Sequence, residues 1–187
     1  YNKSKTYAEK AAWDFINSDE CNMELSVINP SLVLGPVLES DFGTSVELVK
    51  RFLNGGFPLA PNISFGIVDV RDVAQLHLLA LESPQASGNR FIASSETLAI
   101  PLISEFLRKK IPEYQKRLPK GTAPDFLIKL LGFFSPLMKT VANQLGKTKE
   151  LDNSKAKNIL GWQPRSGEEA VIASAKSLIE FDIVKSP

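Results

Sequence analysis

The run LSVINPSLVLGP, residues 25–36, constrains the possible folds of this chain more than any other stretch. Its apolar and β-branched residues form a nearly continuous run, which is typical of a strand buried on both faces of a parallel sheet. Gly35 and Pro36 end the run. Pro30 offers no N–H to a ladder, so we expect it near the end of the regular strand. The run therefore predicts an α/β fold.

Helical patterns lie on both sides of this strand. Residues 4–18 repeat apolar side chains at steps of three and four residues. A second helix is expected from about Ser45 to Asn54, because Thr44 and Glu47 have capping-box spacing and two glycines follow. The apolar positions of the first helix are Ala8, Ala11, Ala12 and Phe15.

Further elements follow towards the carboxyl end. FGIVDVRDVAQLHLLALES, residues 65–83, predicts a short strand that runs into a helix. Asp69 is its expected N-cap, and Arg71 and Asp72 are interpreted as capping and packing groups at the junction. NRFIAS predicts another strand, IPLISEFLRKKIP a helix with a proline in its first turn, and Ser166 with Glu169 a second capping box. About three strands are few for an α/β chain of 187 residues.

Tyr1 and Lys5 stand four residues apart at the head of the first helical pattern. Residues at this spacing share one helix face, with Cβ atoms about 5–6 Å apart. A phenol titrates near pH 10, and a neighbouring ammonium lowers that pKa by favouring the phenolate. The pair can therefore act as a proton donor or acceptor. Taken alone, the same spacing also fits a plain surface pair.

Four segments, in order, carry a family resemblance: YNKSKTYAEKAAW, INPSLVLGP, IVDVRDVAQLHLLALE and LGWQP. This set resembles the extended short-chain dehydrogenase/reductase superfamily, most closely its dihydroflavonol-reductase-like branch of aldehyde and ketone reductases. It covers nearly the whole chain, but only the later part of the family pattern. The family's Gly-rich turn is absent, since no G-x-x-G-x-x-G occurs and LNGGFP opens no helix. Nothing precedes Tyr1 where the family's catalytic Ser or Thr would stand.

The resemblance implies an NADP-dependent oxidoreductase, with NAD as a possible cofactor, and assigns roles to five residues. Tyr1 would protonate the substrate carbonyl oxygen while NADPH delivers hydride. Lys5 would lower the pKa of Tyr1 and bind the nicotinamide ribose. Pro30, Ser31 and Leu32 would lie beside the nicotinamide. The alternative for Pro30 and Ser31 is a plain strand-to-loop turn.

The fold implied by the resemblance is the C-terminal part of a Rossmann-like doubly wound parallel sheet plus a small, mostly helical substrate-binding domain. Residues 1–35 would end the dinucleotide-binding domain. Residues 36–187 would form the substrate-binding region, interleaved with the last sheet elements at about 66–95. The expected substrate-lining residues are Val37, Phe57 and Phe65.

Three functions remain open at this point. The first is NADP-dependent reduction of a small or medium apolar aldehyde or ketone, with this chain expected to be inactive alone. The second is sugar-nucleotide epimerisation or dehydration within the same superfamily. Relatives of that kind carry a longer segment after the Gly-Pro turn, whereas residues 37–66 here are compact and largely apolar. The third is a non-catalytic dinucleotide-binding sensor, which would need neither Tyr1 nor Lys5.

Composition limits the partners. The net charge is +1, which gives no reason to expect nucleic acid, and no apolar run approaches the roughly 20 residues of a spanning helix. We expect a small-molecule carbonyl partner, no membrane partner and a monomer or homodimer.

The single cysteine, Cys21, favours a reducing, cytoplasmic setting. His77, the only histidine, is expected to pack in the core, and no metal site is expected. FLIKLLGFFSPLM is expected to form a buried or partly buried helix–turn.

Overall fold

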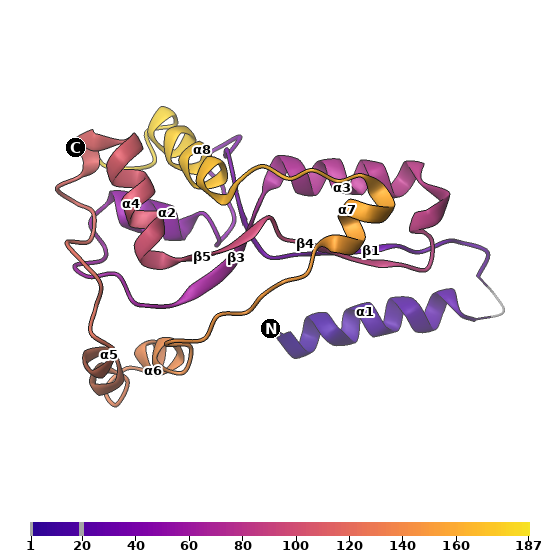
Figure 1. Ribbon diagram of the computed structural model, residues 1–187, viewed down its shortest axis with the longest axis horizontal. Helices are drawn as coiled ribbons and strands as arrows, with labels where there is room; N and C mark the ends of the chain where they lie inside the picture. Colours follow the sequence, from indigo (N-terminus) through magenta and orange to yellow (C-terminus); the bar gives the residue numbers. More distant parts are fainter. Residues whose placement is uncertain (1, 19–20) are drawn as a thin grey trace.

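The computed structural model describes residues 2–18 and 21–187, with five strands and eight α-helices among them. The strands lie in the middle of an elongated molecule, and helices flank them (Figure 1). The strands are β1 (Val27–Pro30), β2 (Leu32–Leu34), β3 (Ser64–Asp69), β4 (Arg90–Ala93) and β5 (Glu96–Ala99). The helices are α1 (Asn2–Ile16), α2 (Glu47–Leu53), α3 (Val70–Glu82), α4 (Ile100–Lys110), α5 (Asp125–Leu131), α6 (Pro136–Ala142), α7 (Ser154–Leu160) and α8 (Gly167–Glu180).

The long apolar run divides at Ser31 and supplies strands to two sheets. β1 pairs in parallel with β4, and β2 pairs in parallel with β3. Pro30 is the last residue of β1, as its missing N–H predicted. The parallel α/β architecture is therefore confirmed. Sequence reasoning missed β5, which pairs antiparallel with β3, because its four residues ETLA are too few for a periodic pattern.

Two cores hold the sheets and helices together. The first lies among β2, β3 and β5 and helices α2, α4 and α8, where Phe52, Ile103 and Leu178 are fully buried. The second lies among β1, β4, α3 and α7, and Trp162 is its largest buried side chain. The indole N–H of Trp162 donates to the main-chain oxygen of Asp72 at 2.9 Å, so the burial of this polar group is compensated.

Charged side chains stabilise the junction between β3 and α3 through hydrogen bonds and ion pairs. Asp69 caps α3 by accepting from the N–H of Arg71 at 2.9 Å, and its carboxylate also pairs with the Arg71 guanidinium. Asp72 is fully buried and accepts from both the main-chain N–H and the guanidinium of Arg165. The capping and packing roles expected for these residues are confirmed. Asp72 thereby attaches the segment before α8 to α3.

We expect Asp72→Asn to lower the free energy of unfolding by about 2–4 kcal/mol. Breaking a buried ion pair costs roughly 3–5 kcal/mol, and the 41% exposure of the Arg165 side chain reduces that figure. Urea unfolding followed by circular dichroism measures the change. The matched control is Lys110→Gln, which removes an exposed 3.9 Å pair with Glu168 and should shift stability by less than about 0.5 kcal/mol. Equal unfolding midpoints for the two variants would contradict the assigned role of Asp72.

The core position predicted for His77 is wrong. α3 buries Asp72, Leu76 and Ala80, whereas the imidazole of His77 is exposed and Nδ1 lies 2.8 Å from the main-chain oxygen of Val73. Successive helix residues are rotated by about 100°, so a residue next to Leu76 points away from the buried stripe. α3 carries apolar side chains on two faces, and the sequence pattern did not show which face is covered.

The helix predicted from about Ser45 to Asn54 is present as α2, but its predicted capping box is absent, whereas the capping box of α8 is confirmed. α2 begins at Glu47 with Val46 in the N-cap position, and no side chain caps it. In α8, the Ser166 side chain accepts from the N–H of Glu169, and the Glu169 carboxylate accepts from the N–H of Ser166. Both pairs have the same spacing, so spacing alone does not decide whether a box forms.

FLIKLLGFFSPLM forms the predicted helix–turn as α5, a turn and the start of α6, and it is only partly buried, the weaker of the two degrees of burial expected. Ile128 is buried, whereas five large apolar side chains are exposed. α5 and α6 pack mainly on each other, so few of their apolar groups reach the core of the molecule (Figure 1). The exposed side chains are Phe126, Leu130, Leu131, Phe133 and Phe134.

Candidate active site

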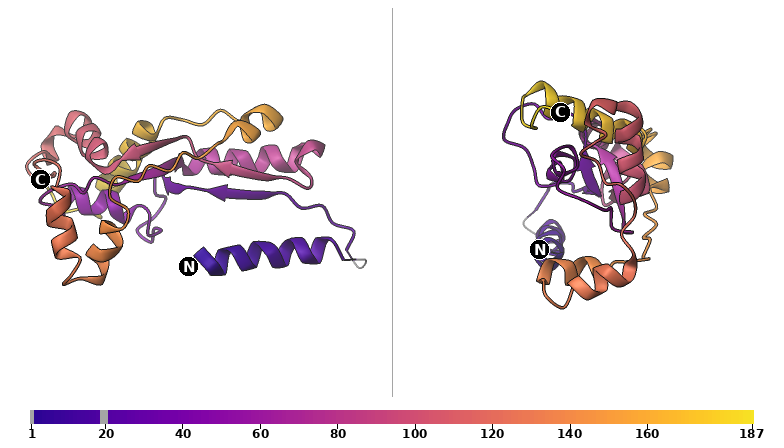
Figure 2. Two further views of the ribbon diagram at one scale, coloured as in Figure 1. Left: turned by 60° about the horizontal axis from the view of Figure 1, so that its bottom comes forward. Right: turned by 90° about the vertical axis from the view of Figure 1, so that its left-hand side faces the viewer.

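The first candidate site is formed by the N-terminal end of α1 and the carboxyl end of β1. α1 runs opposite to β1, so these two ends point the same way (Figures 1 and 2). Lys5, in the first two turns of α1, is exposed, and so is Pro30 at the end of β1. Tyr1 lies outside the described residues. The structure thus directs the N-terminal end of α1, which carries Lys5, and the carboxyl end of β1 the same way, near the middle of the long axis of the molecule (Figure 1).

α1 is attached to the strands through Glu9. The Glu9 carboxylate accepts from both Nε and Nη2 of Arg90 in β4, the latter at 3.0 Å, and from the Trp13 indole at 3.2 Å. The hydrogen bond from Arg90 is the main reason why the pKa of Glu9 lies below its ordinary value. The same contact raises the pKa of Arg90. This ion pair fixes how α1 is rotated against the strands.

The apolar face that the sequence predicted for α1 is largely exposed. Ala8 and Ala11 are exposed, and the Phe15 side chain is 55% exposed, whereas Ala12 is half-buried. The side of α1 that faces the strands carries Glu9 and Trp13 instead. The apolar positions of α1 therefore lie mainly on the side that the described residues leave uncovered, and the ion pair between Glu9 and Arg90 orients the helix.

The junction between β1 and β2 is tightly packed around Ser31. The Ser31 hydroxyl is buried and has no hydrogen-bond partner among the described residues, and the same is true of Ser94. Gly66 of β3 lies between them, where an added Cβ would stand 2.9 Å from Ser94 Oγ and 3.1 Å from Ser31 Cβ. Leu32 is half-buried against the first core. Of the three residues expected beside the nicotinamide, only Pro30 presents an exposed side chain.

These observations test how well the chain fits a dinucleotide. An exposed ammonium on Lys5 suits ribose hydroxyls, and the exposed Pro30 ring with the unpartnered Ser31 hydroxyl behind it suits a planar ring with a polar edge. The two glycines of LNGGFP end α2, since the N–H groups of Gly55 and Gly56 donate to carbonyls of that helix. They start no helix that could receive a diphosphate. Lys5 and Pro30 are therefore the exposed residues that could hold the nicotinamide end of a dinucleotide, whereas Gly55 and Gly56 offer no diphosphate site.

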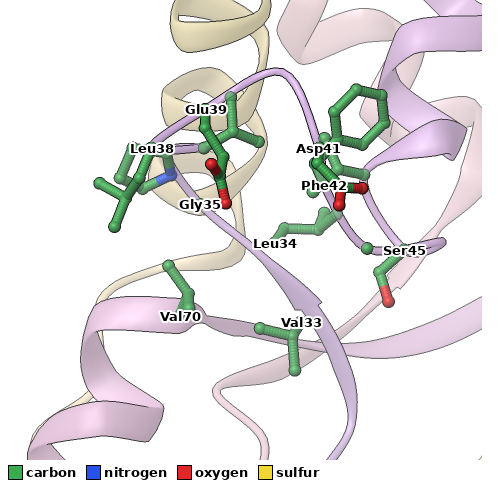
Figure 3. Close-up of a pocket in the computed structure, with 13 residues that line it drawn as sticks. Val33, Leu34, Gly35, Leu38, Glu39, Asp41, Phe42, Ser45 and Val70 are labelled. Carbon is green, nitrogen blue, oxygen red and sulfur yellow. The ribbon is translucent and has the colours of Figure 1, made fainter.

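A second feature is a cavity of ≈ 290 Å³ in the turn after β2 (Figure 3). Apolar side chains from residues 33–46 and Val70 line most of it. Among the described residues, its only charged lining groups are the carboxylates of Glu39 and Asp41, which lie on opposite sides of the turn (Figure 3), and none of its lining residues there is basic. The cavity thus suits a small neutral or cationic molecule better than an anion.

Helix α8 holds this turn in place. The Ser174 hydroxyl accepts from the N–H of Gly35 at 2.7 Å and lies 2.8 Å from its carbonyl oxygen. The Ser177 hydroxyl accepts from the N–H of Val37 at 2.9 Å. Gly35 has φ +121°, and an added Cβ would stand 2.9 Å from the Val70 side chain, so glycine is required there. The C-terminal helix therefore shapes a cavity made mainly by residues far from it in sequence.

The structure brings only one of the three expected substrate-lining residues to this cavity. Val37 lines it. Phe57 and Phe65 are half-buried elsewhere against the first core, and Phe57 packs on Phe52 with ring centroids 5.0 Å apart. The cavity is also lined by Leu38, Glu39, Asp41 and Phe42, which follow the Gly-Pro turn. They lie beyond the end of a parallel strand, where ligands commonly bind in α/β folds.

The strands β1 and β4, and β2 and β3, pair in parallel and are linked by crossover connections. The N-terminal end of α1 points the same way as the carboxyl end of β1. These features define the Rossmann-like class of α/β proteins. The chain is 35% identical over 191 residues to a ketoreductase, azaE, of Aspergillus niger, covering 96% of this chain and 51% of the relative. It is 31% identical over 190 residues to an NADPH-dependent methylglyoxal reductase, GRE2, of Saccharomyces cerevisiae, covering 97% and 51%. The crystal structure of yeast methylglyoxal/isovaleraldehyde reductase Gre2 with NADPH superposes with a TM-score of 0.75 at 29% identity, covering 96% and 51%.

The chain belongs to the extended short-chain dehydrogenase/reductase superfamily, in its dihydroflavonol-reductase-like branch. It spans about half the length of the curated relatives it matches. No family model matches the chain. A nucleoside-diphosphate-sugar epimerase from Pseudomonas aeruginosa also superposes, with a TM-score of 0.64 over 88% of this chain, but at 18% identity the likeness concerns the fold alone. Among the described residues, no helix is both long and apolar enough to cross a bilayer.

Proposed function

We propose that the protein carrying this chain reduces small or medium apolar aldehydes and ketones with NADPH. The observation that carries the proposal is the shared orientation of the Lys5 end of α1 and the carboxyl end of β1. The names of two relatives, a ketoreductase and an NADPH-dependent methylglyoxal reductase, support the same chemistry. Residues 1–35 would end the dinucleotide-binding domain, and residues 36–187 would form the substrate-binding region around the last strands.

The chain's own residues would contribute proton transfer and orientation. NADPH, when bound, supplies the hydride. Tyr1 would donate a proton to the carbonyl oxygen, and the Lys5 ammonium would favour the resulting phenolate and hold the nicotinamide ribose. Pro30, Ser31 and Leu32 would form one wall beside the nicotinamide. The cavity after β2 would receive the apolar body of the substrate.

The lining of that cavity supports a neutral carbonyl substrate over a nucleotide sugar. Glu39 and Asp41 supply negative charge, and no lining residue supplies a positive one. A diphosphate placed there would meet like charges without a compensating cation, which disfavours binding. The volume of ≈ 290 Å³ is also at the lower end of the range for ligand pockets. Epimerisation of a nucleotide sugar is therefore the weaker candidate.

The test is NADPH consumption by the full-length protein with a panel of carbonyl compounds. We expect turnover with apolar aldehydes and ketones, and kcat/KM at least about tenfold lower for an analogue of equal size that carries a carboxylate, because Glu39 and Asp41 repel it. A nucleotide sugar serves as the comparison ligand. Conversion of that sugar, without reductase turnover, would favour the epimerase. Tight NADPH binding without conversion of any substrate would favour a sensor.

A further inference from the structure

The α5–α6 hairpin presents two adjacent aromatic side chains at its tip. Phe133 and Phe134 lie in the turn between the helices, and their side chains are 85% and 82% exposed. The two helices pack closely at Gly132, where an added Cβ would stand 3.3 Å from Cα of Lys139. Exposed Leu130 extends the apolar surface from the tip along α5. A single exposed apolar residue is common, but a contiguous patch of this kind indicates a binding surface.

The hairpin projects from one end of the molecule. Figures 1 and 2 show α5 and α6 set apart from the strands, joined to them by extended segments on both sides. Main-chain hydrogen bonds hold its base, from the N–H of Ala60 to the oxygen of Gly121 at 2.8 Å and from the N–H of Gly146 to the oxygen of Asn62 at 3.4 Å. The tip is therefore presented on a tethered base, where it can meet a surface without rearrangement of the core.

Lysine side chains accompany the hairpin, and two of them, Lys129 and Lys139, line one hollow with Phe133 and Phe134. Residues 120–149 carry five lysines and one acidic residue, so their net charge is +4, whereas the whole chain carries +1. All five lysines are exposed, and no ion pair involving them is found in the part of the chain that the structure describes. The five are Lys120, Lys129, Lys139, Lys147 and Lys149.

We propose that this hairpin docks the protein on the surface of an anionic phospholipid bilayer. Phe133 and Phe134 enter the boundary between headgroups and acyl chains, and the surrounding lysines bind lipid phosphates. Exposed aromatic and leucine side chains with a lysine rim are the features by which interfacial helices bind anionic lipid. Such attachment requires no spanning helix, so it is compatible with the lack of one among the described residues. It departs from the expectation of no membrane partner, which rested on the length of a spanning helix alone.

The charge favours a lipid surface over the other possible occupants. A second copy of the hairpin would bring Lys129 and Lys139 of each tip close together, and these like charges oppose close contact. A protein segment covering the tip would bury Phe133 and Phe134 but would leave the lysine surplus unexplained unless it were strongly acidic. A bilayer containing anionic lipid would bury the apolar tip among its acyl chains and bind the lysines through its phosphates.

Sedimentation of the full-length protein with vesicles tests the proposal. We expect co-sedimentation with vesicles of mixed phosphatidylcholine and phosphatidylglycerol, and little with phosphatidylcholine alone. Raising the salt from about 0.1 M to about 0.5 M should weaken binding, because it screens the lysine–phosphate attraction. Phe133→Ser/Phe134→Ser and Lys129→Glu/Lys139→Glu should each reduce the vesicle partition coefficient at least about tenfold.

Matched control variants change exposed apolar or lysine side chains outside the hairpin. Leu78→Ser/Leu81→Ser removes two exposed apolar side chains from α3, and Lys155→Glu/Lys157→Glu reverses two exposed charges on α7. Both should bind within about twofold of the unaltered protein. Failure of that protein to bind mixed vesicles, or equal binding by the hairpin and control variants, overturns the proposal. If light scattering shows that Phe133→Ser/Phe134→Ser dissolves a dimer while vesicle binding is unchanged, the tip is a protein interface and the proposal fails.

Discussion

Replacing Tyr1 by Phe in the full-length protein is expected to lower kcat for carbonyl reduction by about 10²–10⁴-fold while the affinity for NADPH changes little. The phenol is the only group that we propose as the proton donor, and general acid catalysis is typically worth that factor. Phe keeps the ring and its packing but lacks the hydroxyl. Steady-state NADPH oxidation with an apolar aldehyde gives kcat, and calorimetry gives the cofactor affinity. An undiminished kcat would remove Tyr1 from the reaction.

Lys5→Met is the matched comparison, since Lys5 is proposed to act on both Tyr1 and the ribose. It should weaken NADPH binding as well as lower kcat, and it should move the alkaline limb of the pH–rate profile upwards. The sign follows from the charge: an ammonium stabilises the phenolate, so its loss raises the pKa of the phenol. If the pH–rate profile and the NADPH affinity are both unchanged, Lys5 has no role in the reaction or in cofactor binding.

Much of the fold could be predicted because the decisive elements carry strong local patterns. The nearly continuous apolar run at residues 25–36 indicates parallel strands, and Pro30 marks where β1 must end. Asp69 and the Ser166–Glu169 box mark the starts of α3 and α8 through hydrogen bonds between near neighbours in sequence. Interactions between near neighbours in sequence produce a pattern that can be recognised in a short stretch of residues. That pattern was sufficient to predict where these strands and helices begin or end.

The failed predictions concern which side of a helix is covered, which depends on distant residues. The side of α1 that faces the strands is set by Glu9, which pairs with Arg90, 81 positions later in the chain. His77 was assigned to the core because α3 has apolar residues on two faces. β5 was missed because an antiparallel pairing with β3 stabilises four residues that have little pattern of their own.

The candidate site was predicted by family resemblance more than by residue chemistry. Lys5 and Pro30 could be proposed because the Tyr-x-x-Ser-Lys segment and the strand that follows it match a known order of segments. The cavity after β2 could not be derived in the same way. Its shape depends on Ser174 and Ser177 of α8, which bind Gly35 and Val37 across about 140 residues of sequence.

A polypeptide of these 187 residues alone is expected to bind NADPH at least about a hundredfold more weakly than the full-length protein, a difference of about 2.7 kcal/mol or more, and to show no turnover. The chain fits the nicotinamide end of the cofactor, but the diphosphate requires main-chain N–H groups at a helix N-terminus opened by glycines. Gly55 and Gly56 instead donate their N–H groups to carbonyls of α2. The exposed face of α1, including Phe15, should also promote association.

Calorimetry with NADPH measures the affinity, with the full-length protein as the positive control. Circular dichroism must first show that the shorter polypeptide contains the expected helices, because an unfolded chain would fail to bind for another reason. Mass spectrometry must confirm 20.6 kDa, so that no longer form accounts for the result. Equal NADPH affinity in the folded 187-residue chain would mean that it contains a diphosphate site that glycine-turn chemistry does not describe. Weak binding by a folded chain would place the missing affinity in the diphosphate and adenosine contacts, which these residues do not supply.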